Sequence, residues 1–170
     1  MNTLTNRAVV IDDAKHFVAN TTDSFDLIVT DVPAAFAIQT ATLYSVPFYE
    51  SIASRLTNDG VLVVNLTTRL KEDNLVSRRI AASLLQIFDD VVIVTSESSR
   101  LSYAFAGNHL PFDFIQLRDV LESNGESAYK LLHHDAIESI VRDAKPITLD
   151  SMDFVLQVSA DWIADRLNWR

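Results

Sequence analysis

The stretch that most constrains the fold is residues 25–33, which read FDLIVTDVP. Its centre, Leu27-Ile28-Val29, is an uninterrupted apolar run rich in β-branched residues. Such a run is typical of a strand that is buried on both faces of a helix-covered parallel sheet. Asp31 follows the run, and ligands of open α/β sheets bind beyond the carboxyl ends of the strands. Asp31 is therefore a candidate site residue; the alternative is that it caps the next helix or turn.

Further apolar runs predict the rest of a mixed α/β fold. Strands are expected at residues 7–11, 61–66, 91–95 and 101–106, and helices at residues 14–19, 43–56 and 71–88. Strands that alternate with helices indicate a parallel sheet with right-handed crossovers. Too few residues join the last two strands for a crossover, so we expect these two strands to be antiparallel.

Residues that start or stop helices refine this prediction. Pro47 suits the first turn of the second helix, where its missing N–H costs nothing. The turn Asn58-Asp59-Gly60 is expected to close that helix. Asp73 is expected to cap the start of the third helix.

After residue 112 the pattern becomes helical. Apolar stripes at residues 114–121, 129–141 and 152–167 each have helical spacing. We therefore expect an α/β domain over residues 1–112 and a helical extension over residues 113–170 that packs on it. Trp162 and Trp169 indicate either a contact with another chain or docking on the chain's own sheet.

Several polar residues have a structural as well as a functional interpretation. Arg78 and Arg79 are expected on the solvated face of a helix, and His16 on a partly exposed one. His133 and His134 suggest metal chemistry, but neighbouring residues of a helix point about 100° apart and rarely bind one ion together. We therefore expect no metal site.

Composition narrows the classes of partner. The chain has 170 residues, no cysteine and a formal net charge of −9. The lack of cysteine excludes disulfides and thiolate metal sites and fits a cytoplasmic protein. No run approaches the roughly 18 apolar residues of a membrane span, and the start of the chain has no signal-peptide pattern. An acidic chain is poorly suited to a phosphate backbone, so neither nucleic acid nor a membrane is an expected partner.

Three stretches, VVIDDAKHFV (residues 9–18), residues 25–66 and SYAFAGNHLPFD (residues 102–113), together resemble spermidine synthases, the polyamine aminopropyltransferases. Residues 9–18, VVIDDAKHFV, resemble the family's segment in which a strand ends in an acidic and a small residue before a helix. Residues 25–66 are similar to the next block, in which a strand ends in the catalytic aspartate. The matching positions in that block are Asp31, Leu43-Tyr44, Phe48-Tyr49 and Gly60-Val61. Residues 102–113 resemble the family's last strand, and the resemblance as a whole covers roughly residues 7–112.

The resemblance implies a fold and a chemistry. The fold is a reduced, Rossmann-like sheet of the class I S-adenosylmethionine-dependent methyltransferase type, mostly parallel, with an antiparallel last strand. Asp13 would accept a hydrogen bond from the adenine amino group, and the Ala14 N–H would reach an adenine ring nitrogen. The alternative for Asp13 is that it only caps the helix that follows it. Asp31 would take a proton from the attacking amine. The implied partners are decarboxylated S-adenosylmethionine, or S-adenosylmethionine itself, and a polyamine.

The chain also departs from the family's pattern. Ala34 stands where the family has a second acidic residue. The family holds the donor's tail with a Gly-rich turn, but this chain has only Gly60, Gly107 and Gly125, and none lies near its start. Three functions therefore stay open: an aminopropyltransferase, a non-catalytic relic of the fold that serves protein interaction or dimerisation, and another S-adenosylmethionine-fold transferase.

The place of this chain in the family's strand order affects which strands of the sheet can pair. In the family's strand order the fourth strand lies beside the first, and this chain starts at what would be the third. The strand at residues 26–30 thus lacks its neighbour, and an open apolar edge is an aggregation hazard. We predict that residues 7–11 pair with residues 26–30 as a parallel strand. The alternative is that a partner chain, or a second copy in a homo-oligomer, covers this edge.

Overall fold

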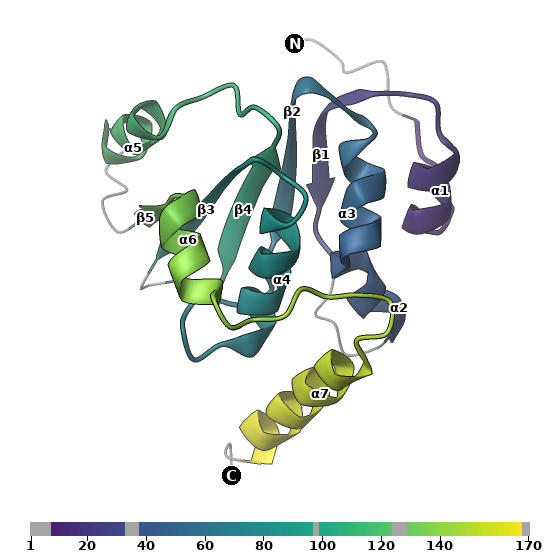
Figure 1. Ribbon diagram of the computed structural model, residues 1–170, viewed down its shortest axis with the longest axis vertical. Helices are drawn as coiled ribbons and strands as arrows, with labels where there is room; N and C mark the ends of the chain where they lie inside the picture. The colour runs from purple at the N-terminus through teal and green to yellow at the C-terminus, as the bar shows by residue number, and fades with distance from the viewer. Residues whose placement is uncertain (1–7, 33–37, 97–98, 124–128, 168–170) are drawn as a thin grey trace.

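Figure 1 shows the computed structural model, which describes residues 8–32, 38–96, 99–123 and 129–167. Its sheet contains β1 (Phe25–Thr30), β2 (Leu56–Asn65), β3 (Asp90–Ser96), β4 (Ser102–Gly107) and β5 (Tyr129–Leu132). The helices are α1 (Ala14–Asn20), α2 (Ile38–Ala41), the 3-10 turn η1 (Thr42–Tyr44), α3 (Val46–Ala53), α4 (Leu75–Leu85), α5 (Phe114–Ser123), α6 (His134–Val141) and α7 (Met152–Leu167). The mixed α/β class predicted from the sequence is confirmed.

The sheet has the strand order β1-β2-β4-β3-β5. β1 and β2 are parallel, whereas β4 is antiparallel to both of its neighbours, β2 and β3. The predicted antiparallel pairing of β3 and β4 is confirmed, with Ile93 opposite Ala104. It follows that β1, β2 and β3 run in the same direction, so their carboxyl ends lie at one edge of the sheet.

The main core lies on one face of the sheet, beneath α3, α4 and α6 (Figure 1). Leu62 and Val64 of β2 point into this core, while Val61 points to a smaller cluster on the opposite face. β1 differs from the prediction of burial on both faces, because Leu27 and Val29 are exposed and only Ile28 packs against the core. In the part of the chain that the structure describes, the opposite face of β1 lacks a covering helix.

The predicted pairing of residues 7–11 with β1 is wrong. Residues 8–11 form no strand, and Val9, Val10 and Ile11 are exposed. Among the described strands, β1 pairs with β2 alone. The physical reason lies in α1, which packs beside α3 and carries the preceding residues away from the sheet. Residue 7 lies outside the described residues.

Several predicted boundaries shift. Residues 43–56 divide into η1 and α3, with Pro47 in the first turn of α3 as expected. Asn74, rather than Asp73, caps α4, since its side chain accepts a hydrogen bond from the Ser77 N–H. The expected turn at residues 58–60 lies inside β2, where the register with β1 is irregular. Gly60 is needed there, because a Cβ would lie 2.9 Å from the Phe25 carbonyl oxygen.

The segment after residue 112 is not wholly helical. Residues 129–132, assigned to a helical stripe from the sequence, form β5 and extend the sheet beside β3. Helical periodicity and strand alternation are hard to separate in so short an apolar run. The division of the chain at residue 112 stays a prediction. Trp169 lies outside the described residues, as does the side chain of Trp162.

Arg79 anchors the C-terminal segment and is buried, so its prediction as part of a solvated helix face is wrong. Its guanidinium donates to the Lys145 carbonyl at 2.9 Å and pairs with Asp153 at 2.8 Å. It also lies over the Phe154 ring, 5.0 Å from the centroid. The neighbouring Arg78 is largely buried too and pairs with Asp143.

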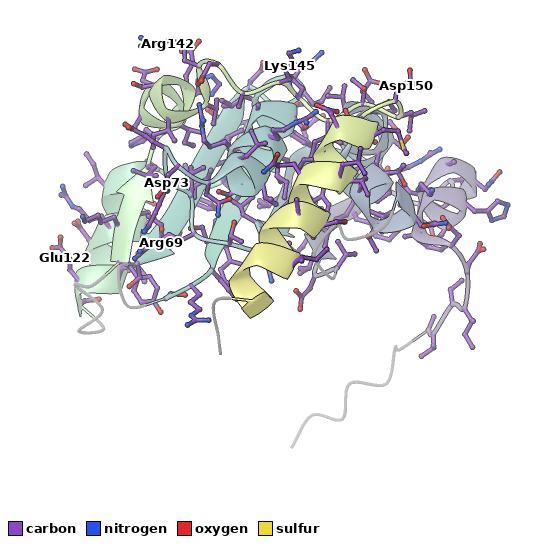
Figure 2. All side chains as sticks on the ribbon, turned by 90° about the horizontal axis from the view of Figure 1, so that it is seen from below. Arg69, Asp73, Glu122, Arg142, Lys145 and Asp150 are labelled. Atoms are coloured by element: carbon purple, nitrogen blue, oxygen red, sulfur yellow. The ribbon has the colours of Figure 1, made fainter. Side chains whose placement is uncertain are left out.

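Two backbone groups of the same segment complete the attachment. The Ile147 N–H donates to Ser83 Oγ of α4 at 2.8 Å, and the Ile147 carbonyl accepts from the Val46 N–H of α3 at 2.8 Å. Figure 2 shows this segment crossing the helical layer between the labelled Lys145 and Asp150. Residues 144–154 therefore tie α3, α4 and α7 together.

We expect Arg79→Ala to lower the free energy of unfolding by about 2–3 kcal/mol, because hydrogen bonds to a buried charged group contribute about 1.5–3 kcal/mol. Asp153→Asn should cost less than about 1 kcal/mol, since Asp153 is exposed and only the charge of the pair is lost. Urea denaturation followed by circular dichroism measures both. The exposed Arg142→Ala is the control, and an equal loss in all three variants would contradict this role for Arg79.

Candidate functional site

Asp31 lies directly after β1 at the edge where the parallel strands end. Its side chain is exposed, and its Oδ1 accepts a hydrogen bond from Asn65 Nδ2 at 3.0 Å. Asn65 is the last residue of β2. Because parallel neighbours end at the same edge, the two strands bring these side chains together although they are far apart in the sequence.

Asn65 has a second hydrogen bond that sets its orientation. Its Oδ1 accepts from the Thr67 N–H at 2.9 Å, which leaves the amide NH₂ to face Asp31. Thr67 has a left-handed backbone, with φ 62°, and its hydroxyl is buried without a partner among the described residues. The loop after β2 thus holds Asn65 as a donor to the carboxylate. Sequence reasoning missed Asn65; its place at the end of the strand after Asp31 was the available signal.

Tyr44 and Tyr49 lie behind this edge and are fully buried in the core. The Tyr44 hydroxyl donates to the Val32 carbonyl at 2.9 Å. Burial, with a smaller contribution from the negative charge of Asp31, raises the pKa of Tyr44. Burial also raises the pKa of Tyr49, with a smaller contribution from Tyr44. Both phenols therefore stay neutral at physiological pH, and their side chains pack in the core behind Asp31.

Asp13 and Ala14 form the start of α1. Asp13 is the N-cap, and its Oδ1 accepts from the Lys15 N–H at 2.8 Å and from the His16 N–H at 3.4 Å. Ala14 is the first helical residue, and the N–H groups of a first turn have no partner within the helix. The capping interpretation of Asp13 is thus observed, while contact of Asp13 and Ala14 with adenine stays a prediction.

α1 is joined to the segment that carries Tyr44. Lys15 Nζ donates to Thr42 Oγ1 of η1 at 3.0 Å, and Arg55 donates to the carbonyls of Val18 and Ala19 at 3.1 and 3.2 Å. The helix that begins at Asp13 is therefore fixed relative to the layer behind Asp31. Ala34, which stands at the position of the family's second acidic residue, lies outside the described residues.

The cavity next along the same edge carries the opposite charge to Asp31. It has a volume of about 490 Å³ and is lined by Arg69, Lys71 and Arg100, with Asp73 beside them (Figure 2). Three cationic side chains repel an ammonium group. This cavity is therefore poorly suited to a cation, whereas the Asp31 carboxylate attracts one.

The expectation that the histidines bind no metal stays a prediction. No group of three or more His, Asp or Glu side chains is placed to hold a metal ion among the described residues. His133 precedes α6 as its N-cap residue, and His134 opens the helix. His16 pairs instead with Asp12, with 2.7 Å between Nδ1 and Oδ2.

The described part of the chain is an α/β protein with Asp31 at the carboxyl end of a strand that pairs in parallel with its neighbour. Residues 5–99 match the spermine/spermidine synthase domain. This match covers more than half of the chain, so the chain belongs to the spermine/spermidine synthase domain family. A search of curated proteins finds no match.

Solved structures agree with this fold. A probable spermidine synthase from Corynebacterium glutamicum is 18% identical with a TM-score of 0.64, over 81% of this chain and 52% of that one. A spermidine synthase in complex with the transition-state analogue AdoDATO is 19% identical with a TM-score of 0.54, over 90% and 50%. Human methyltransferase-like protein 13 in complex with SAH is 17% identical with a TM-score of 0.52, over 85% and 63%.

These matches also show how much of the related structures this chain covers. It spans about half the length of the spermidine synthase structures that it matches. The resemblance seen in the sequence and the methyltransferase-type fold class are both confirmed. No helix among the described residues is both long and apolar enough to cross a membrane.

The two buried tyrosines should respond in opposite ways to loss of the hydroxyl. Tyr49 Oη finds no hydrogen-bond partner within the described chain, so Tyr49→Phe should raise the free energy of unfolding by about 1 kcal/mol. Tyr44→Phe should lower it by about 1 kcal/mol, because the bond to Val32 is lost. Denaturant titrations of the two variants test this, and a loss of stability in Tyr49→Phe would contradict it.

The exposed Asp12–His16 pair should set a pH window for α1. Its hydrogen bond, together with its charge, raises the pKa of His16 and lowers that of Asp12. The pair is therefore intact between these two values. It is lost when pH rises through the raised pKa of His16, or falls through the lowered pKa of Asp12.

Titration of the His16 ring by NMR measures this effect. Asp12→Asn should bring the pKa of His16 back toward its ordinary value, because the carboxylate partner is gone. Asp23→Asn removes an exposed carboxylate elsewhere and is the control. An equal shift of the His16 pKa in both variants would rule out the specific pair.

Proposed function

We propose that this chain provides the acceptor site of an aminopropyl transfer from decarboxylated S-adenosylmethionine to a polyamine. The observation that carries the proposal is the exposed Asp31 carboxylate at the carboxyl end of β1, held by the amide of Asn65. Membership of the spermine/spermidine synthase domain family supports the choice of reaction. Because the chain spans about half of its structural neighbours, its activity and substrates are proposals.

Asp31 has two tasks in this reaction. Its carboxylate first attracts the ammonium form of the acceptor. An amine attacks carbon only when it is neutral, so the nitrogen must lose a proton on the way to the C–N bond. Asp31 accepts that proton as the bond forms and the C–S bond of the sulfonium breaks. The thioether leaves uncharged, so no general acid is required. Asn65 donates to Oδ1, which leaves Oδ2 for the acceptor.

The donor's adenine matches the start of α1. A carboxylate oxygen of Asp13 accepts from the adenine amino group, and the Ala14 N–H donates to a ring nitrogen. Two neighbours support a nucleoside of this kind, since their complexes contain AdoDATO and SAH. This match between the chain and the donor is limited to the donor's adenine. Gly60 and Gly107 are strand residues near the edge opposite Asp31, so neither provides a turn for the donor's tail.

The proposal also includes the acceptor, the expected partners and the location of the protein. The acceptor is a small polyamine, which suits an acidic chain with a net charge of −9. Neither nucleic acid nor a membrane has a place in this reaction. A cytoplasmic location is part of the proposal and stays a prediction.

Substitution of Asp31 tests the proposed role. We expect Asp31→Asn to lower the rate of aminopropyl transfer by about 10²–10⁴-fold, the usual contribution of a general base, because the amide cannot accept the proton. Its affinity for methylthioadenosine, measured by calorimetry, should stay within a factor of two to three of the unsubstituted chain, since Asp31 does not contact adenine.

The matched control is Asp26→Asn, which removes an exposed carboxylate at the other end of the same strand. It should leave the rate of transfer unchanged. Undiminished transfer by Asp31→Asn would exclude Asp31 as the proton acceptor. If the folded chain binds neither decarboxylated S-adenosylmethionine nor methylthioadenosine, the transferase proposal fails for this chain as it stands.

A further inference from the structure

Two connections face each other at the carboxyl edge of the sheet. One leads from β2 to α4 and the other from β3 to β4. Because β4 lies between β2 and β3, the ends of these two strands are two strand spacings apart, about 10 Å. The cavity of about 490 Å³ that carries Arg69, Lys71 and Arg100 takes its described lining from these two connections. β1 and the residues before it contribute none of that lining.

Buried serine hydroxyls hold the walls of this cavity in place. Ser102 of β4 is fully buried, and its Oγ accepts from the Leu70 N–H at 3.0 Å. Ser77 of α4 is also fully buried, and its hydroxyl donates to the Arg69 carbonyl at 3.1 Å. The Arg69 guanidinium donates in turn to the carbonyl of Ser96, the last residue of β3, at 3.3 Å. The shape of the cavity is therefore fixed by the chain's own hydrogen bonds.

The cavity concentrates positive charge in an acidic chain. Its three cationic side chains are accompanied by one carboxylate, Asp73, so its described lining has a net charge of +2, whereas the whole chain has −9. Lys71 and Arg100 are exposed, and neither forms an ion pair within the described chain. Like charges that are held close together repel one another. A bound anion would relieve this repulsion.

Neutral side chains of the lining add hydrogen-bond donors. Asn74 Oδ1 accepts from the Ser77 N–H and from the Thr68 hydroxyl, both at 3.1 Å. The Asn74 NH₂ group points away from these donors and has no acceptor among the described residues. Ser99 Oγ accepts from the Leu101 N–H at 3.0 Å, and its own proton has no acceptor in the same ranges. Both groups can therefore donate to a ligand in the cavity.

We propose that this cavity binds the phosphate group of a small molecule. Lys71 and Arg100 supply the charge, and the Asn74 amide and the Ser99 hydroxyl donate to the phosphate oxygens. A phosphate monoester carries a charge of about −1.5 to −2 near pH 7, which complements the net charge of the lining. The volume lies within the range of about 300–1,000 Å³ that is usual for small-molecule sites. This inference goes beyond the proposed transferase function and does not depend on it.

The start of α4 supports the choice of phosphate. Asn74 is the N-cap of this 11-residue helix, so the first turn of the helix begins beside the cavity. The N–H groups of a first turn have no partners within the helix and carry the positive end of its dipole. Phosphates bind at such helix starts. The net charge of −9 repels a phosphate backbone, so the ligand is a small molecule rather than a nucleic acid.

Titration with inorganic phosphate, followed by NMR, tests the site. Saturable shifts are expected for the backbone amides of residues 68–74 and 99–100. Lys71→Gln and Arg100→Gln should each raise the dissociation constant for phosphate about three- to tenfold, because each removes a charged donor at an exposed site. Asp73→Asn should lower it about two- to threefold, because the carboxylate repels the anion.

Lys145→Gln is the matched control for the loss of one positive charge. Lys145 is exposed and lies outside the cavity, away from the labelled Arg69 and Asp73 in Figure 2. Its substitution should change the dissociation constant by less than about a factor of two, since distant exposed charges are screened by salt. Asp31→Asn should also leave phosphate binding unchanged, which separates this site from the proposed transferase function. Circular dichroism must first show that every variant is folded like the unsubstituted chain.

Four results would overturn the proposal. The first is no saturable binding of phosphate by the folded, unsubstituted chain. The second is an equal loss of affinity in Lys145→Gln and Arg100→Gln, which would indicate attraction by overall charge alone. The third is weaker binding by Asp73→Asn. The fourth comes from a titration with succinate, a dianion without a phosphate group: binding as tight as that of phosphate would mean that the cavity does not select phosphate.

Discussion

The candidate site depends on the parallel pairing of β1 with β2. Because the two strands run in the same direction, their carboxyl ends meet, and the Asn65 amide reaches the Asp31 carboxylate at 3.0 Å. An antiparallel pair would place these residues at opposite edges of the sheet. The irregular register near Gly60 then lets the strands stay paired up to these ends. The hydrogen bond between Asn65 and Asp31 therefore depends on the direction of the two strands.

A second constraint determines which surfaces stay open. The segment that follows α6 is tied to α3 and α4 by Arg79, Ser83 and Ile147, so the helical layer is closed on that side. Nothing comparable covers β1, where α1 is held against α3 by Arg55 instead of against the strand. The chain is therefore well packed at the β3 side of the sheet and open at β1 in the described residues, next to its candidate site.

Patterns that act over short distances could be predicted from the sequence. The apolar run of β1, Asp31 at its end, and the short connection that makes β3 and β4 antiparallel were all visible. Contacts between distant segments could not be. In the sequence Arg79 cannot be told from a surface arginine, because the C-terminal segment that buries it lies more than 60 residues away. β5 is too short for its periodicity to distinguish a strand from a helix. Residues 8–11 have a strand's composition, yet they form no strand in the structure.

The sequence by itself determined the mixed α/β class, the position of Asp31 at the end of a strand and the cap that Asp13 forms on α1. Each of these depends on a few neighbouring residues, whose backbone preferences and alternation act locally. Tertiary structure decided that Asn65 holds Asp31, that Tyr44 lies neutral behind it and that one edge of β1 has no partner within the described chain. These features depend on which segments pack against one another, and that is settled by the whole core.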